Sequence, residues 1–262
     1  MNLFLNAFAW IFDPQNWQPG GTSPLPIQDR LLEHLLYTVV AVVIAAAIAL
    51  PLGFYIGHTG KGRQFVIGFT GAMRALPTLG VLFFLTMVLG SLVKGASGVF
   101  WGTIVALVIL AIPSILAGAY AGLESVSRTT IDAARAVGMT EMQILTRVEI
   151  PLALPLIIGG LRAGTLQVIA TAVIASYAGL GGLGRIISSG IGLNDYDRIL
   201  GGAILVTVFA LVVDALFAIV QRLTRISGAS AGTTRRSLRH PSPRPATAAG
   251  AATPIPERNV TA

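Results

Sequence analysis

The sequence predicts an all-α, polytopic integral membrane protein with about five transmembrane helices. Hydrophobic residues make up 54% of the 262 residues and charged residues only 11%, whereas soluble domains carry roughly 25% charged residues. The mean hydropathy is +0.77, and five separate apolar stretches approach the ~20 residues that cross a bilayer as a helix. We therefore expect a chain that faces membrane lipid over most of its length.

The expected spans are long apolar segments separated by polar or glycine-rich connections. Pro77 interrupts the second span and Pro113 the third, which membrane helices tolerate where neighbouring helices bond the freed carbonyl. Residues 1–30 precede the first span and begin with an apolar run that is too short to cross the membrane. Trp10 and Trp17 suit the headgroup zone, so we expect this segment to be extracytoplasmic and interfacial. The spans cover residues 34–57, 65–89, 99–123, 154–177 and 199–220.

Glycines four residues apart recur inside or beside these spans. Such pairs predict close packing of helix against helix, because a missing side chain lets two backbones approach each other. The pairs are Gly53/Gly57, Gly98/Gly102, Gly118/Gly122 and Gly160/Gly164.

Basic residues gather on one predicted side of the membrane. With five spans, that side receives the short loop with Lys61 and Arg63, the long polar loop 124–151 and the tail 226–262. The positive-inside rule makes this side cytoplasmic, with the N-terminus outside and the C-terminus in the cytoplasm. This also accounts for much of the net charge of +7, so we expect no nucleic-acid partner. The transmembrane domain then covers 31–225, and the Arg-, Ser- and Pro-rich tail is expected to be disordered.

Composition also limits the chemistry that the chain can perform. The sequence has no cysteine, and its three histidines are far apart. Disulfides and thiolate sites are excluded, and we expect no metal site and no cofactor.

The long polar loop carries two short helical patterns joined by a glycine. Helix formers dominate before Gly138, and a second run follows it. In that run Met142, Leu145 and Val148 recur at helical spacing and should form one apolar face. Pro151 should end the loop where the fourth span begins. On periodicity alone, an ordinary surface loop is an equal alternative.

In this loop the sequence resembles the inner-membrane subunits of binding-protein-dependent ABC importers. The signature of that family is E-A-A, three residues, G, nine residues, then I-x-L-P. This chain has Asp132-Ala133-Ala134, then Gly138, then Val148–Pro151 at the same spacing. Aspartate for glutamate, valine for isoleucine and isoleucine for leucine are conservative departures.

The resemblance extends from about residue 31 to 222 and is strongest with permeases of the osmoprotectant type, for glycine betaine, carnitine and choline. It implies the fold of a type I, methionine-importer-like ABC permease and a quaternary amine as the solute. An amino acid is the alternative solute. A stand-alone secondary transporter or channel is the alternative class, although the sequence shows no internal repeat. The subfamily resemblance is carried by Leu32–Leu36, Arg74–Leu79 and Gly179–Gly184.

The resemblance also implies partners in the cell membrane. The chain itself would not be an enzyme: a separate ABC ATPase subunit would hydrolyse ATP, and a second permease subunit would complete a homo- or heterodimer. An extracytoplasmic solute-binding protein would deliver the solute, and lipid would surround the spans. The residues implied in coupling to the ATPase are Asp132, Ala133, Ala134, Gly138, Glu141 and Pro151.

A glycine-rich stretch after the fourth span matches G-x-G-x-x-G. A dinucleotide site needs this motif after a β-strand, whereas a membrane span precedes it here. We therefore expect a flexible turn or an outer gate segment made by Gly179, Gly181, Gly182 and Gly184.

Three charged residues fall inside the predicted spans. Counted at ~1.5 Å per residue, Arg74, Arg162 and Asp214 all lie ~12–17 Å inside the cytoplasmic boundary. Our hypothesis is that Asp214 neutralises one of the two arginines near the translocation pathway, to which we also assign Pro77 and Thr78. A static structural ion pair, or arginines that snorkel to the interface, are the alternatives.

Overall fold

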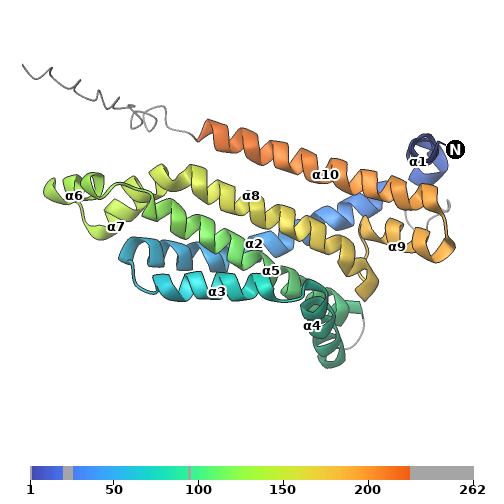
Figure 1. Cartoon of the computed structure of the whole chain (residues 1–262), viewed down its shortest axis with the longest axis horizontal. Coiled ribbons are helices and arrows are strands. Elements are labelled where there is room, and N and C mark those ends of the chain that lie inside the picture. The colour runs from blue at the N-terminus through green and yellow to red at the C-terminus, as the bar shows by residue number, and fades with distance from the viewer. Residues whose placement is uncertain (1, 20–25, 94–95, 225–262) are drawn as a thin grey trace, which may run out of the picture. The chain divides into compact units, whose positions relative to one another are not determined.

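The protein is described by a computed structural model, which covers residues 2–19, 26–93 and 96–224. All the regular structure in these residues is helical (Figure 1). Within them, four helices are long and apolar enough to cross a membrane, and a bent pair can form a fifth span. The four are α2 (Ile27–Thr59), α5 (Ala96–Glu124), α8 (Ile150–Ala175) and α10 (Tyr196–Leu223). The expected tail, 226–262, lies outside the described residues.

The second expected span is two helices rather than one. Helix α3 (Arg63–Ala75) and helix α4 (Thr78–Leu92) meet at an angle of 87°. Leu76, between them, is extended, with φ −68° and ψ 134°, because a proline disfavours helical geometry in the residue before it. Pro77 therefore redirects the chain, and α4 turns away from the line of α3 (Figure 1).

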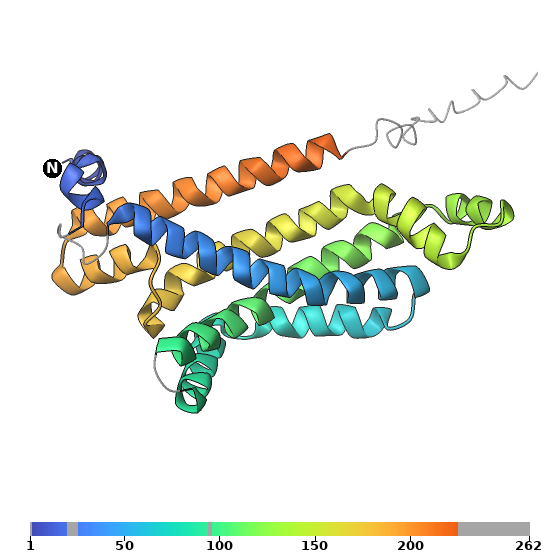
Figure 2. The same cartoon turned by 180° about the vertical axis from the view of Figure 1, so that it is seen from behind.

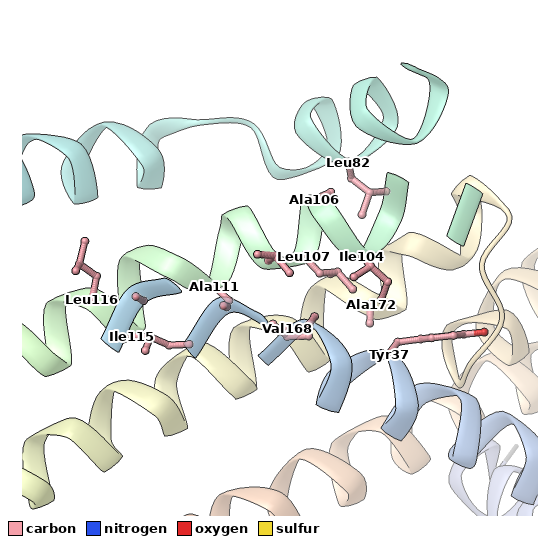
Figure 3. Packing of buried hydrophobic residues seen from close by; sticks show 14 of the residues in the cluster. Tyr37, Leu82, Ile104, Ala106, Leu107, Ala111, Ile115, Leu116, Val168 and Ala172 are labelled. Carbon is pink, nitrogen blue, oxygen red and sulfur yellow. The ribbon is translucent and has the colours of Figure 1, made fainter. Parts of the chain in front are cut away.

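Helix α5 lies at the centre of the bundle. It packs against α2 on one side and α8 on another, and it also contacts α3 and α4. Leu107, Ala111 and Ile115 of α5 are fully buried together with Val168 and Ala172 of α8 (Figure 3). Small and branched apolar side chains thus fill the space where these helices meet, and the view from behind shows α2 crossing the same core (Figure 2).

The glycine pairs mark the closest helix contacts, as predicted from their spacing. A Cβ on Gly160 would lie 2.7 Å from Gly118 Cα, so the backbones of α8 and α5 touch there. A Cβ on Gly53 would lie 2.6 Å from Ala119 Cβ, which brings α2 equally close to α5. A Cβ on Gly102 would meet the α4 backbone at Thr86, 2.7 Å away.

The N-terminal segment packs on the protein. Helix α1 (Leu3–Phe12) and the 3₁₀ turn η1 (Pro14–Trp17) precede α2, and α1 contacts α10. The Trp10 ring lies 5.9 Å from the Arg198 guanidinium carbon. Trp17 Nε1 donates to the carbonyl of Ile11 at 2.7 Å.

One further helix was not expected from the sequence. Helix α9 (Gly184–Leu193) follows a 3₁₀ turn, η3 (Ser176–Ala178), in the stretch that looked like a glycine-rich connection. Asn194 ends α9 in the left-handed conformation, with φ 55°. The Asp195 side chain then accepts from the Arg198 amide and caps α10, so two turn-forming residues reverse the chain.

The polar loop folds into two helical segments, but its second half differs from the prediction. Helix α6 (Arg128–Ala136) is followed by α7 (Glu141–Ile144), a π-helical turn η2 (Leu145–Glu149) and then α8, without a break at Pro151. Pro151 lies in the first turn of α8, where the missing N–H is least costly. It therefore does not end the loop.

Candidate functional site

The elbow between α6 and α7 is built from local caps. Ser127 Oγ accepts from the amide of Thr130 at 3.2 Å and so begins α6. Thr140 and Gln143 form a reciprocal capping box at the start of α7. Between the helices Gly138 has φ +86°, and a Cβ there would meet nothing within 4 Å. Glycine is therefore needed at Gly138 for its backbone conformation and not for space.

A small apolar core of its own holds the loop together. Val126, Ile131, Ala134 and Ile144 are buried against one another. The expected apolar face was partly wrong, because Met142 is 67% exposed whereas Ile144 is fully buried. Helix α7 spans only four residues before the π-turn changes the register, so a 3.6-residue period does not hold from 142 to 148.

The signature residues divide between the two faces of α6. Ala134 is 8% exposed and packs inside the loop, whereas Asp132 and Ala133 are exposed to solvent. Of the two alanines, Ala133 is thus the one that another protein could contact closely.

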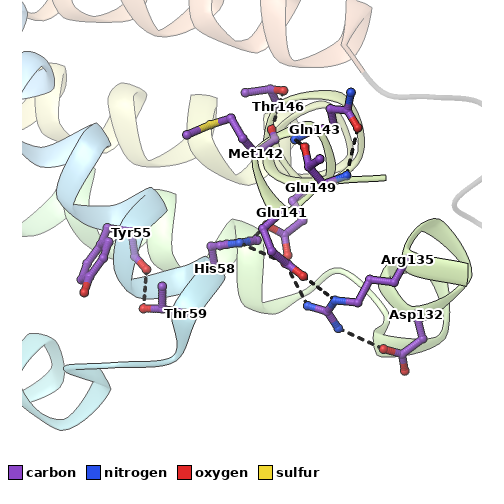
Figure 4. A network of polar contacts seen from close by, with 11 residues as sticks. Tyr55, His58, Thr59, Asp132, Arg135, Glu141, Met142, Gln143, Thr146 and Glu149 are labelled. Carbon is purple, nitrogen blue, oxygen red and sulfur yellow. Dashed lines mark hydrogen bonds and ion pairs between the residues drawn. The ribbon is translucent and has the colours of Figure 1, made fainter. Parts of the chain in front are cut away.

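A series of polar contacts ties the loop to the end of α2 (Figure 4). Asp132 lies 3.2 Å from Arg135, whose guanidinium also donates to Glu141 at 2.7 and 3.0 Å. His58 Nε2 lies 3.4 Å from the same Glu141 carboxylate, and His58 Nδ1 lies 2.5 Å from Glu149. The hydrogen bonds with Glu141 raise the pKa of Arg135 above its usual value, so the pair stays charged.

Sequence analysis did not predict two residues of this series of contacts, His58 and Glu149. Glu149 is 2% exposed although it stands in the polar loop, and a buried carboxylate needs a partner. His58, which the sequence treats as an isolated histidine, supplies that partner from a position 91 residues earlier. The one available signal was an acidic residue between apolar neighbours, Val148 and Ile150.

Other polar contacts gather at the same end of the bundle. Arg63 at the start of α3 lies 3.1 Å from Glu124 at the end of α5. Gln221 near the end of α10 donates to the carbonyl of Pro155 on α8 at 2.7 Å. The start of α3 therefore meets the end of α5, and the end of α10 meets the first turns of α8.

The intramembrane charges form one defined pair. Arg162 on α8 donates from Nε and Nη2 to the two oxygens of Asp214 on α10, at 2.5 and 2.6 Å. Their side chains are 33% and 27% exposed. The side chain of Arg74 lies outside the described part of the chain.

The remaining pathway candidates lie away from this pair. Thr78 lines a cavity of about 330 Å³ at the bend between α3 and α4, together with Pro113 and Gln167. Arg162 lines a different cavity of about 560 Å³, near the end of α10. Among the described side chains, Thr78 and Arg162 therefore line different cavities of this subunit.

The glycine-rich segment is tightly packed and not a loose turn. Gly179 and Gly182 have φ of +99° and +77°. A Cβ on Gly181 would overlap the Glu33 carboxylate, and one on Gly184 would overlap the carbonyl of Val173. Glycine is therefore required at these positions by contact with α2 and α8. In the described residues, no three His, Cys, Asp or Glu side chains are grouped as a metal site needs.

The chain is similar to known proteins over most of this structure. Residues 49–226 match the family described as binding-protein-dependent transport system inner membrane component. The sequence is 36% identical over 190 residues to the glycine betaine/carnitine/choline transport system permease protein OpuCB of Bacillus subtilis, covering 72% of this chain and 84% of that protein. It is 39% identical over 193 residues to the carnitine transport permease protein OpuCB of Listeria monocytogenes, covering 73% and 85%.

A broader relative and a solved structure extend the comparison. The osmoprotectant import permease protein OsmY of Salmonella typhimurium is 33% identical over 218 residues, covering 82% of this chain and 88% of that one. A chain of the MetNI methionine ABC transporter in an inward-facing conformation superposes with a TM-score of 0.67 at 22% identity, covering 76% and 96%. This last likeness concerns the fold.

Proposed function

The chain belongs to the family of binding-protein-dependent transport system inner membrane components, and from this premise and its similarity to osmoprotectant permeases we propose that it imports glycine betaine or a related quaternary amine. It is a permease subunit of an ABC importer with the type I permease fold, and it is not itself an enzyme. The names of the relatives support this choice of solute, because they are named as transport permeases for carnitine, for glycine betaine, carnitine and choline, or for osmoprotectants.

The α6–α7 elbow is proposed to be the site where an ABC ATPase docks. Asp132 and Ala133 are exposed on it, and Gly138 sets its angle. The polar contacts through Glu141 and His58 would transmit a movement of the elbow to α2. Because α7 continues through the π-turn into α8, the same movement would reach the translocation pathway directly.

The orientation is proposed to follow the positive-inside rule. The end of the helix bundle that carries the elbow also carries four basic residues, Lys61, Arg63, Arg128 and Arg147. This end would be cytoplasmic. A solute-binding protein would then dock at the opposite end. The C-terminus would then be cytoplasmic, and the uptake of a chain truncated before residue 226 would show whether the tail is needed for transport.

The pathway is proposed to lie between two permease subunits. Thr78 and Pro77 would line it at the bend of α3 and α4, next to the 330 Å³ cavity. The Arg162–Asp214 pair would hold α10 against α8 without net charge, because an unpaired arginine would repel the quaternary ammonium group of the solute. The glycine segment at the far end would form the outer gate.

Reconstitution tests this function. The permease, its ATPase and its binding protein would be placed in liposomes, and uptake of radiolabelled glycine betaine would be measured with and without ATP. We expect uptake that requires all three proteins and ATP, and that excess choline or carnitine inhibits. Inhibition by amino acids instead would reassign the solute, and uptake without the ATPase would indicate a secondary transporter.

A further inference from the structure

Two cavities follow one another between α8 and α10, which run side by side along the bundle (Figures 1 and 2). The first, of about 560 Å³, lies near the end of α10 and is called the end cavity below. The second, of about 360 Å³, lies further along both helices and is called the inner cavity. The Arg162–Asp214 pair stands between them, because Arg162 lines the end cavity and Asp214 the inner one. Together they form one groove, the α8–α10 groove.

The end cavity carries positive charge. Arg222, in the last turn of α10, is exposed and lines it. Among the described residues, no carboxylate lies within ion-pair distance of Arg222. Arg162 is neutralised by Asp214, but it bonds Asp214 through Nε and Nη2, which leaves the N–H groups of Nη1 for the cavity. The net charge of the lining therefore comes from Arg222.

The sequence beyond α10 adds to this positive charge. It contains five arginines before its first acidic residue, Glu257. Basic residues directly after a membrane helix attract anionic lipid headgroups from the adjoining leaflet. The composition of the chain and the lining of the end cavity thus favour the same sign of ligand charge.

The inner cavity is apolar. Its two polar lining residues already have partners within the protein: Asp214 accepts from Arg162, and Thr207 donates to the carbonyl of Ala203 on its own helix at 2.8 Å. A ligand part without hydrogen-bonding groups therefore suits it. The apolar lining residues are Leu166, Ile169 and Ala170 of α8 and Val206, Ala210 and Leu211 of α10.

The groove has the length of one leaflet. Arg222 and Val206, at its two ends, are 16 residues apart on α10, or about 24 Å at ~1.5 Å per residue. Half of a bilayer of ~40–45 Å, headgroups included, is about 20–22 Å. The charged end lies at the end of the helix and the apolar end toward the middle of the membrane. A phospholipid places its headgroup and its acyl chains in the same order.

We propose that the α8–α10 groove binds one anionic phospholipid, with its phosphate on Arg222 and on Nη1 of Arg162 and an acyl chain in the inner cavity. A small free anion would leave the inner cavity empty, and a zwitterionic lipid would bring a second positive charge beside Arg222. The assignment to the cytoplasmic leaflet rests on the proposed orientation.

The lipid would lie apart from the proposed translocation pathway. The cavity at Thr78 also contacts α8, but through Ala163 and Gln167, which line neither cavity of the groove. Helix α8 thus presents one face to that cavity and another to α10.

Lipid titration tests the charged end. The permease assembled with its ATPase, purified in detergent and stripped of lipid, would be titrated with radiolabelled phosphatidylglycerol and separately with phosphatidylcholine. We expect saturable binding of one phosphatidylglycerol per permease subunit and weaker binding of phosphatidylcholine. Arg222→Gln should weaken phosphatidylglycerol binding about fivefold, the effect of one basic residue near an anionic lipid. Lys61→Gln removes one positive charge outside the groove and should leave binding unchanged.

A second pair of variants tests the apolar end. Ala170 is exposed and lines the inner cavity, so Ala170→Phe should fill that cavity and weaken the binding of either lipid. Ala215→Phe adds the same ring at an exposed position of α10 that lines neither cavity, and should have no effect. Excess inorganic phosphate should not displace the lipid, because phosphate cannot occupy the inner cavity.

Several outcomes would overturn the proposal. These are equal affinity for the two lipids, equal effects of Arg222→Gln and Lys61→Gln or of Ala170→Phe and Ala215→Phe, and displacement by phosphate, which would indicate a site for free anions. The chain has no cysteine, so Ala170→Cys introduces a unique thiol. A disulfide between two copies of this variant would show that a second subunit covers the groove instead of lipid. The solute takes no part in these measurements, so failure of the uptake assay leaves the lipid site standing, and failure of lipid binding leaves the proposed function standing.

Discussion

Replacing Gly160 by alanine should force α8 and α5 apart. The new Cβ would lie 2.7 Å from Gly118 Cα and 3.1 Å from the Ser114 carbonyl, whereas ordinary contacts begin at 3.4 Å. Both neighbours are backbone atoms, so the helices must separate by several tenths of an ångström along their closest contact. Overpacking of this kind costs about 1–3 kcal/mol, which outweighs the roughly 0.5–1 kcal/mol that alanine gains over glycine in a helix.

Gly159 provides a matched control one position earlier on the same helix. A Cβ there would meet only Gln221 Nε2, at 3.5 Å, so Gly159→Ala should keep or raise stability. Thermal unfolding of both variants in the same detergent would measure the difference, which we expect to be about 2 kcal/mol, or about 5 °C in Tm. Equal midpoints for Gly159→Ala and Gly160→Ala would refute the claim that backbone contact sets the spacing of these helices.

Three further changes test the charges and the elbow. Arg162→Asp and Asp214→Arg should each remove most uptake, because each variant places like charges in contact. The double variant restores opposite charges and should recover at least about a tenth of the wild-type uptake. A double variant with uptake as low as that of either single variant would contradict the pairing. Gly138→Ala should reduce the amount of ATPase that co-purifies roughly fivefold, because a backbone φ of +86° costs residues other than glycine about 1 kcal/mol. The control is Gly192→Ala, which places a side chain in open space without a positive φ and should leave co-purification unchanged. His58→Ala should lower the free energy of unfolding by about 1–3 kcal/mol, because it leaves the buried Glu149 carboxylate without its partner. His58→Gln should lose less stability, since an amide can still donate a hydrogen bond. Unchanged thermal unfolding of His58→Ala would argue against a stabilising contact between His58 and Glu149.

Several features of the fold could be predicted from local patterns because a membrane imposes them locally. The apolar lengths of four spans and the glycine spacing at Gly118 and Gly160 appear in the structure as expected. Pro77 was predicted to interrupt a span, but the size of the bend was not, since a proline excludes helix at one residue and leaves the direction to the neighbours. Helix α9 was missed because its glycines favour a loop and its helical state depends on packing against α10.

Hydropathy and residue spacing act over short distances along the chain, so they were enough to predict the class of protein and to reveal the family signature at Asp132–Ala134 and Gly138. Periodicity did not distinguish two short helices from an ordinary surface loop in that segment. Which side chains come into contact became clear from the three-dimensional fold. It selected Arg162 as the partner of Asp214, joined His58 to the buried Glu149, and turned Ala134 inward. The two pairs join residues that are far apart in sequence, and the burial of Ala134 depends on which face of α6 packs inside the loop. No local sequence pattern specifies which partner a buried charge will contact.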